Sequence, residues 1–269
     1  MFARWLYYFF ITLSALGLIG VLLAGFAGLV IYSNLPSLDT LTDYRPKIPL
    51  RIYSDEGQLI GEFGAERRNV VSISEVPERL KQAILAAEDD RFYEHGGVDY
   101  LGVLRAAYSN FSAGSVRQGA STITMQVARN FFLTREKTIT RKLSEALLAF
   151  KIEHSLSKDK ILELYVNQIY LGHRSYGFAA AANTYFGKSL QEINIAEAAM
   201  LAGLPKAPSS YNPISNPKRA KNRQLYVLGR LHKLNYISSE ELSELEKQPI
   251  VTGKQIGRAS CRERVYVLV

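Results

Sequence analysis

The feature that most constrains this chain is a run near its start, from Trp5 to Tyr32, that contains no charged residue. Leu, Ile, Val, Phe, Ala and Gly dominate it, and a helix needs roughly 20 such residues to cross a bilayer core. The run exceeds the roughly 7–15 apolar residues of a signal-peptide core, and no small-x-small cleavage site followed by a polar start ends it. A cleaved signal is the alternative; a transmembrane helix over residues 5–32 is the better interpretation.

The ends of this run carry the residues that are typical of membrane interfaces. Aromatic side chains lie near both ends, at Trp5, Tyr7, Tyr8 and Tyr32. Arg4 and the amino terminus are the only charges before the run. We therefore predict a cytoplasmic N-terminus over residues 1–4, a single span, and an exported remainder.

The exported part is expected to form one globular domain of mainly α structure. Residues 33–49 are rich in proline and read as a linker, and Leu50 to Phe63 has the pattern of a short hairpin. Apolar residues then recur at helical spacing from Ser74 onward, and Ser238 with Glu241 is a capping-box signature for a last helix. The domain is assigned to residues 50–250. Residues 253–269, which include the only cysteine, Cys261, lack caps and periodicity and resemble a translated vector sequence.

The charge favours an anionic partner but does not identify it. A formal charge of +8 and a pI of about 9.4 suit phosphate-bearing lipids and lipid pyrophosphates as well as nucleic acid. The sequence has no Walker loop or dinucleotide fingerprint, so no nucleotide cofactor is expected. Its four histidines are scattered and match no zinc spacing. A divalent cation (Mg or Mn) that bridges pyrophosphate oxygens would need few protein ligands, and the metal question stays open.

Glu88 is the strongest candidate for a catalytic base. It follows Leu80 and Ile84 at successive i+4 steps, so its carboxylate lies at the edge of the stripe that faces the core. Partial burial should raise its pKa, and the neighbouring Asp89 and Asp90 should act in the same direction. A solvated acidic helix end is the alternative. Carboxylates at a helix C-terminus oppose the helix dipole, however, which suggests a role other than stability.

A second group of residues is suited to an anion or a sugar. Gly119 to Gln126 is a glycine-containing polar turn that enters a helix, either a plain N-cap or a cradle whose N–H groups bind phosphate. Among the cations that follow, Arg129, Lys137, Arg141 and Lys142 lie within fourteen residues of one another. Arg141 and Glu145 are spaced as an i, i+4 pair, most simply a surface ion pair. The cations suit a diphosphate leaving group.

Five segments in order resemble the peptidoglycan glycosyltransferase domain of class A penicillin-binding proteins and their monofunctional relatives. They are Glu88 to Gly97, Gly119 to Gln126, Arg141 to Glu145, Lys160 to Asn167 and Ala180 to Lys188. Met125 stands where the family more often has Gln. The resemblance implies a lysozyme-like glycosyltransferase domain in the bacterial cytoplasmic (inner) membrane that polymerises lipid II into β-1,4-linked glycan, with inversion and release of polyprenyl diphosphate. Lipid II, the growing glycan strand and membrane lipid would be its partners, and nucleic acid would not.

The resemblance also implies roles for individual residues. Glu88 would be the base for the acceptor hydroxyl and Glu145 a second acidic group on the acceptor side. Arg129 and Lys137, supported by Lys142, would neutralise the leaving pyrophosphate. Substrate contacts are further expected from Asp89, Phe92, His95, Arg105, Gly119, Ser121, Thr122, Gln126, Arg141 and Asn167.

Two other functions and two further expectations complete the predictions. A lysozyme-like muramidase or lytic transglycosylase also uses one Glu in a helical lobe, but it has little use for the cation set. A catalytically silent membrane scaffold would not need both Glu88 and Glu145. Some of the apolar residues beside the proposed cradle are expected to form a lip that dips into the membrane, with core packing as the alternative: Tyr108, Phe111, Phe131, Phe132 and Leu133. The chain is also expected to be the amino-terminal part of a bifunctional enzyme, without its transpeptidase domain.

Overall fold

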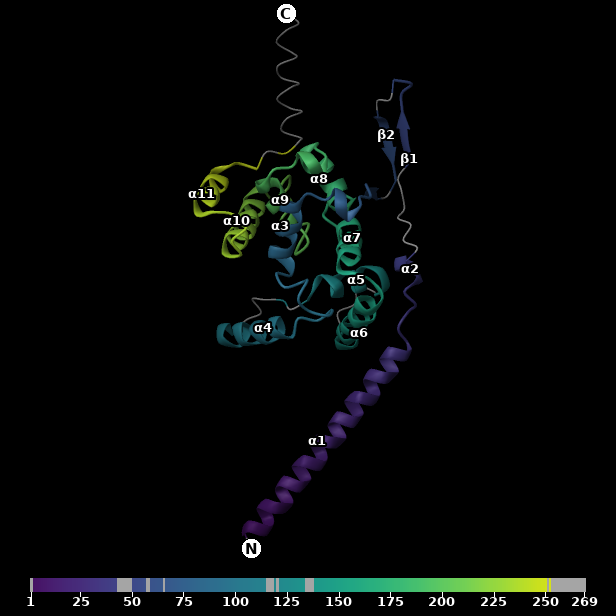
Figure 1. Ribbon diagram of the computed structural model, residues 1–269, viewed down its shortest axis with the longest axis vertical. Helices are drawn as coiled ribbons and strands as arrows, with labels where there is room; N and C mark the ends of the chain where they lie inside the picture. The colour runs from purple at the N-terminus through teal and green to yellow at the C-terminus, as the bar shows by residue number, and fades with distance from the viewer. Residues whose placement is uncertain are drawn as a thin grey trace, which may run out of the picture.

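A long helix precedes the globular part of the chain. The computed structural model describes residues 2–42, 50–56, 59–64, 66–114, 119, 121–133, 138–250 and 252. Helix α1 (Phe2–Ser33) runs away from the other helices (Figure 1). Its segment Tyr7–Ser33 is, by length and composition, able to cross a membrane, and none of its most apolar window is buried. The short helix α2 (Asp39–Thr42) follows, and residues 43–49 and 253–269 of the expected linker and tail lie outside the described residues.

The domain is mainly helical, as the sequence predicts. Its longer helices are α3 (Glu78–Glu88), α4 (Tyr100–Ala113), α5 (Ile123–Phe132), α6 (Ile139–Ser155), α7 (Lys158–Gln168), α8 (Phe178–Phe186), α9 (Ile195–Gly203), α10 (Pro217–Lys233) and α11 (Ser239–Lys247). The 3-10 turn Ile73–Glu75 precedes α3, and the 3-10 turn Leu190–Glu192 lies between α8 and α9. Side-chain caps fix the start of several helices, for example Thr122 before α5, Ser157 before α7 and Asn194 before α9. The predicted capping box of Ser238 and Glu241 is present.

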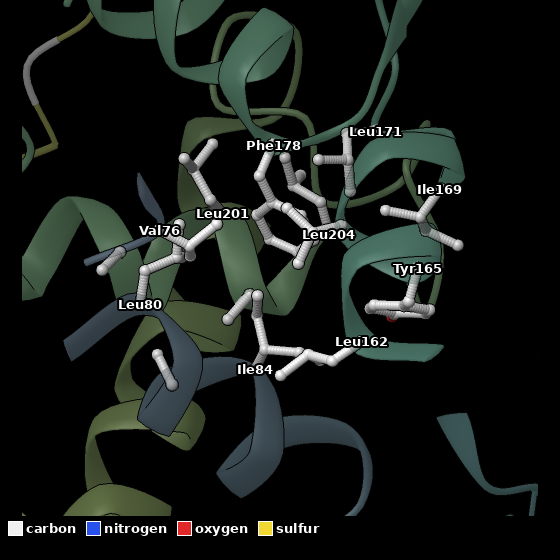
Figure 2. Close-up of a cluster of buried hydrophobic side chains, with 14 of the residues drawn as sticks. Val76, Leu80, Ile84, Leu162, Tyr165, Ile169, Leu171, Phe178, Leu201 and Leu204 are labelled. Atoms are coloured by element: carbon white, nitrogen blue, oxygen red, sulfur yellow. The ribbon is translucent and has the colours of Figure 1, made fainter. Parts of the chain in front are cut away.

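Six of the helices form two groups that share one core. Helices α3, α9 and α10 pack on one another, and α5, α6 and α7 do the same. Between the groups, Leu80 and Ile84 of α3 lie with Leu162 and Tyr165 of α7 and Leu201 of α9 (Figure 2). All five side chains are buried. The last residues of α3, which follow Ile84, therefore lie at the boundary between the two groups.

The strands form two small pairs. Strands β1 (Leu50–Tyr53) and β2 (Leu59–Phe63) are the expected antiparallel hairpin, with a register irregularity between Ile52 and Tyr53. Strands β3 (Arg67–Arg68) and β4 (Ser175–Tyr176) form a parallel pair that the sequence did not predict. The pair joins the start of the domain to the loop after α7.

Helix α4 has an unusual surface. Ala106 is its only buried residue, while Leu101, Leu104, Tyr108 and Phe111 are exposed. Figure 1 shows α4 and α6 at the end of the domain from which α1 departs. At that end Lys151 of α6 donates a hydrogen bond to the carbonyl of Pro36, 3.0 Å away.

Candidate active site

Glu88 is the last residue of α3 and lies at the boundary between the two helix groups. Only 12% of its side chain is exposed, and Gln126 of α5 donates a hydrogen bond from Nε2 to its Oε2 at 2.9 Å. Burial raises the pKa of Glu88, and the opposing effects of Gln126, Arg223, Arg129 and Lys206 do not cancel it. The predicted environment of a buried carboxylate with a raised pKa is therefore found at this position.

The explanation given for that pKa is only partly right. Asp89 and Asp90 are not among the causes of the shift, and each of these carboxylates has other partners. Asp89 accepts hydrogen bonds from Nε2 of His95 at 3.1 Å and from the backbone N–H of Ile123 at 3.0 Å. The second bond places a negative charge at the N-terminus of α5, where the helix dipole favours it. Asp89 thus joins the end of α3 to the start of α5.

A polar cleft opens beside Glu88, with a volume of about 380 Å³. Eight of the predicted site residues line it: Glu88, Asp89, Arg105, Gly119, Ser121, Thr122, Gln126 and Arg129. Thr122 is the N-cap of α5, as the simpler interpretation proposed, and its hydroxyl also donates to the carbonyl of Gly97. The segment that enters α5 therefore serves both as a cap and as a wall of the cleft.

Several residues of the cleft were not predicted from the sequence. The segment just after α9 lines another side of the cleft with Lys206, and helix α10 lines it with Arg223, Tyr226 and Arg230. The Arg223 guanidinium lies 4.4 Å from the centre of the Tyr226 ring, and its Nη2 is 3.9 Å from Oε1 of Glu88. The available signal was the spacing of Arg223 and Arg230, which lie seven residues apart on one side of α10, beside its buried apolar residues.

The cations of the cleft differ in whether they already have an ion-pair partner. Within the described ranges, Arg129 and Lys206 form no ion pair, although both lie close enough to Glu88 to lower its pKa. Arg230 is paired with Asp90 at 2.8 Å, and Arg105 is 3.7 Å from the same carboxylate. Arg129 and Lys206 are therefore the cations best placed to receive an anionic ligand.

Glu145 corrects the prediction of a surface ion pair. Its side chain is buried, and it is paired with both Arg141 and Lys142, the latter at 2.9 Å. None of these three residues lines the cleft, but Lys142 also donates to the hydroxyl of Ser121, which does. The group lies behind the rim of the cleft. Lys137 lies outside the described residues.

Three more predicted residues lie away from the cleft wall. Phe92 is part of the hydrophobic core, and His95 is held behind Asp89. Asn167 is buried, where its side chain accepts from the N–H of Val71 and donates to the carbonyls of Val71 and Glu163. These contacts bind the chain before α3 to α7. The structure places none of the three on the surface of the cleft.

No group of three or more His, Cys, Asp or Glu side chains with metal-site geometry occurs in the part of the chain that the structure describes. Glu88, Asp89 and Asp90 already accept hydrogen bonds from Gln126, His95 and Arg230.

Comparison with known proteins places this cleft in a family. The family model described as Transglycosylase matches residues 56–232, which contain every described wall of the cleft. The chain belongs to the transglycosylase family. It therefore has the lysozyme-like, mainly α domain that the sequence predicts.

Similar proteins of this transglycosylase family are penicillin-binding proteins 1A. The chain is 57% identical to that of Neisseria flavescens over 88% of its own length and 30% of the relative's, and 62% identical to that of Neisseria gonorrhoeae over 79% and 27%. A crystal structure of penicillin-binding protein 1A from Haemophilus influenzae is 32% identical, with a TM-score of 0.45, and covers 83% of this chain and 25% of that one. The chain thus spans under a third of the length of these relatives.

Proposed function

We propose that this chain is a peptidoglycan glycosyltransferase that polymerises lipid II into β-1,4-linked glycan and releases polyprenyl diphosphate. One observation carries the proposal: a largely buried carboxylate with a raised pKa, Glu88, shares a polar cleft with Arg129 and Lys206, two cations that form no ion pair with the residues that the structure describes. A base and an anion site within one cleft are what transfer from a sugar diphosphate to a hydroxyl requires. Membership of the transglycosylase family supports the same reaction.

The reaction follows from the chemistry of the two ends of the cleft. Glu88 takes the proton from the 4-hydroxyl of the acceptor sugar as that oxygen attacks the anomeric carbon of the donor. The bond from this carbon to the diphosphate oxygen breaks, and the diphosphate leaves with the electron pair, so the configuration inverts. Glu88 ends the step protonated. A raised pKa makes its carboxylate a stronger proton acceptor than an exposed one.

Cations serve this reaction better than a second acid would. A diphosphate is already a good leaving group, so its departure needs stabilisation of negative charge more than a proton. Arg129 and Lys206 are available for that task, and Lys137 is proposed to join them. Glu145 is buried between Arg141 and Lys142. It would act by holding Arg141 and Lys142 in place, and through Lys142 it would hold Ser121 at the rim of the cleft. We therefore assign Glu145 to the acceptor side as a supporting group.

The two other functions fit the cleft less well. A muramidase or lytic transglycosylase must protonate a neutral leaving sugar, for which Arg129 and Lys206 offer no advantage. A silent scaffold has no need to keep a carboxylate buried beside Gln126 at a cost in stability. A divalent cation on the donor pyrophosphate would take its ligands mainly from the diphosphate and water, and it stays a prediction.

The substrate requires a cleft close to the bilayer, because its polyprenyl tail stays there. The exposed apolar face of α4 supports this position: Tyr108 and Phe111 are 76% and 88% exposed. Phe131, Phe132 and Leu133, in contrast, are partly buried and packed against the core, so the lip is confined to α4. We propose that the N-terminus is cytoplasmic, that α1 crosses the membrane, and that the apolar face of α4 meets the outer surface of the same membrane.

The direct test is to incubate the purified chain with labelled lipid II in detergent and separate the products by size. Ladders of glycan that disappear with Glu88→Gln are expected. Conversion of preformed glycan into short fragments, without polymer from lipid II, would instead show a lytic enzyme. No turnover of either substrate by a folded chain would favour the scaffold.

A further inference from the structure

Arg230 of α10 holds the end of α3 at two points, one on each side of Glu88. Its Nε donates to the carbonyl of Ala86 at 3.1 Å, and its Nη2 donates to the carboxylate of Asp90 at 2.8 Å. Ala86 precedes Glu88 by two residues, and Asp90 follows it by two. Arg230 thus contacts the chain on both sides of Glu88 without being paired to Glu88 itself.

The helix end needs such a partner. The last carbonyls of a helix have no amide to accept from, and Asp89, with a φ of −160°, already turns the chain away from α3. The Arg230 guanidinium supplies a donor to one of these carbonyls. It also places a positive charge at the C-terminus of α3, which offsets the unfavourable position of Asp90 against the helix dipole. The acidic end of α3 is therefore stabilised from another helix, 140 residues along the chain.

We propose that Arg230 is a positioning residue that fixes the last turn of α3 and so directs the carboxylate of Glu88 into the cleft. The inference rests on the proposed role of Glu88 as the base. An arginine suits the task because its planar fork reaches the carbonyl and the carboxylate at once, whereas a lysine has a single nitrogen.

Arg230 acts on Glu88 through geometry rather than through charge. The groups that face Glu88 and affect its pKa are Gln126 and Arg129 of α5, Arg223 of α10 and Lys206 after α9. Arg230 is not among them. Its loss should therefore let the last turn fray and expose Glu88 to water, and the pKa of Glu88 should then fall toward that of an ordinary glutamate.

The test compares Arg230→Gln with Arg230→Lys, Asp90→Asn and a matched control, Arg219→Gln, an exposed cation on the same helix. With lipid II as substrate, Arg230→Gln should lower kcat about 10-fold or more at a nearly constant KM, since small displacements of a reacting group are costly. The acid limb of its pH profile should move to lower pH. Arg230→Lys should be intermediate, and Asp90→Asn combined with Arg230→Gln should be less than additive.

Hydrogen–deuterium exchange provides a readout that does not depend on turnover. Peptides that cover residues 84–92 should exchange faster in Arg230→Gln than in the wild type, and Arg219→Gln should change nothing. Unchanged exchange and kcat would overturn the proposal, as would a rise in KM alone, which would show a substrate contact. A kcat loss with an unmoved acid limb would indicate general destabilisation. If the wild type makes no polymer, the proposed function fails, while exchange still decides whether Arg230 holds α3.

Discussion

Gln126 donates a hydrogen bond to Oε2 of Glu88 across 2.9 Å, and this bond joins the first turn of α5 to the last residue of α3. It fixes one carboxylate oxygen and leaves Oε1 on the side of Arg223, 3.9 Å away. An amide donor favours the charged form of a carboxylate. Burial nevertheless prevails and raises the pKa of Glu88. The carboxylate is thus oriented and destabilised at the same time, which is the condition expected of a general base.

The first prediction concerns Glu88→Gln. The new side chain has nearly the same shape, and its carbonyl oxygen can still accept the hydrogen bond from Gln126, so the fold should persist. Polymerisation should fall by about 10²-fold or more because the base is lost. Initial rates with labelled lipid II measure this, with circular dichroism as the control for folding. A rate within a few-fold of the wild type would reject Glu88 as the base.

The same variant should be more stable than the wild type at neutral pH. The folded pKa of Glu88 lies above its unfolded value, so between the two values the folded state binds more protons and loses stability as the pH rises. Above that window the buried charge has its full cost, which Gln does not have. Thermal melts between pH 4 and pH 8 should show a Tm difference in favour of Gln that shrinks toward low pH. A difference independent of pH would contradict this explanation.

A third prediction concerns Arg129, the cation that α5 contributes to the cleft. Arg129→Ala should lower kcat/KM for lipid II by about 10- to 100-fold, the worth of a hydrogen bond to a charged group. If Arg129 and Lys137 act on one pyrophosphate, the double variant should lose less than the product of the single losses. Arg219→Ala, which removes an exposed cation outside the cleft, is the control. Strict additivity would assign the two residues separate tasks.

The sequence predicted those features that depend on local spacing. Helix starts could be placed because residues such as Thr122 and Ser238 cap the helix that follows them directly. The partial burial of Glu88 followed from its i+4 spacing after Leu80 and Ile84. Each of these depends on a few consecutive residues.

The features that were missed depend on contacts between distant segments. Arg230 meets Asp90 across 140 residues, and β3 meets β4 across more than 100, so no local period reveals either. Glu145 was assigned to the surface because its i, i+4 pair with Arg141 is common on exposed helix faces; the packing of α6 against α5 and α7 buries it. Asn167 was expected to contact the substrate. Its hydrogen bonds to Val71 were not anticipated, because the two residues are far apart in the sequence.

The exposed face of α4 gives a fourth prediction. Phe111→Trp in a Trp5→Phe background has a single indole, since Trp5 is the only tryptophan of the chain. In liposomes that contain brominated lipids, its fluorescence should be strongly quenched, because an apolar lip inserts its side chains among the lipid chains. Tyr236→Trp, at an exposed position between α10 and α11, is the matched control and should not be quenched. If the brominated lipids quenched the fluorescence of neither variant, α4 would lie away from the membrane.

The last prediction is that the chain as given does not react with penicillin, although Ser155-Leu156-Ser157-Lys158 fits the Ser-x-x-Lys acylation pattern. Ser155 ends α6, and its hydroxyl donates to the carbonyl of Lys151 at 3.0 Å. Lys158 donates instead to Glu153 at 2.7 Å and to the carbonyl of His95, and its Nζ lies 4.4 Å from the centre of the Phe92 ring. The lysine that would have to activate the serine is thus engaged by α6 and the segment after α3, which gives the pair a structural role. Incubation with a fluorescent β-lactam should leave the chain unlabelled on a denaturing gel, and a covalent label that disappears in Ser155→Ala would refute this interpretation.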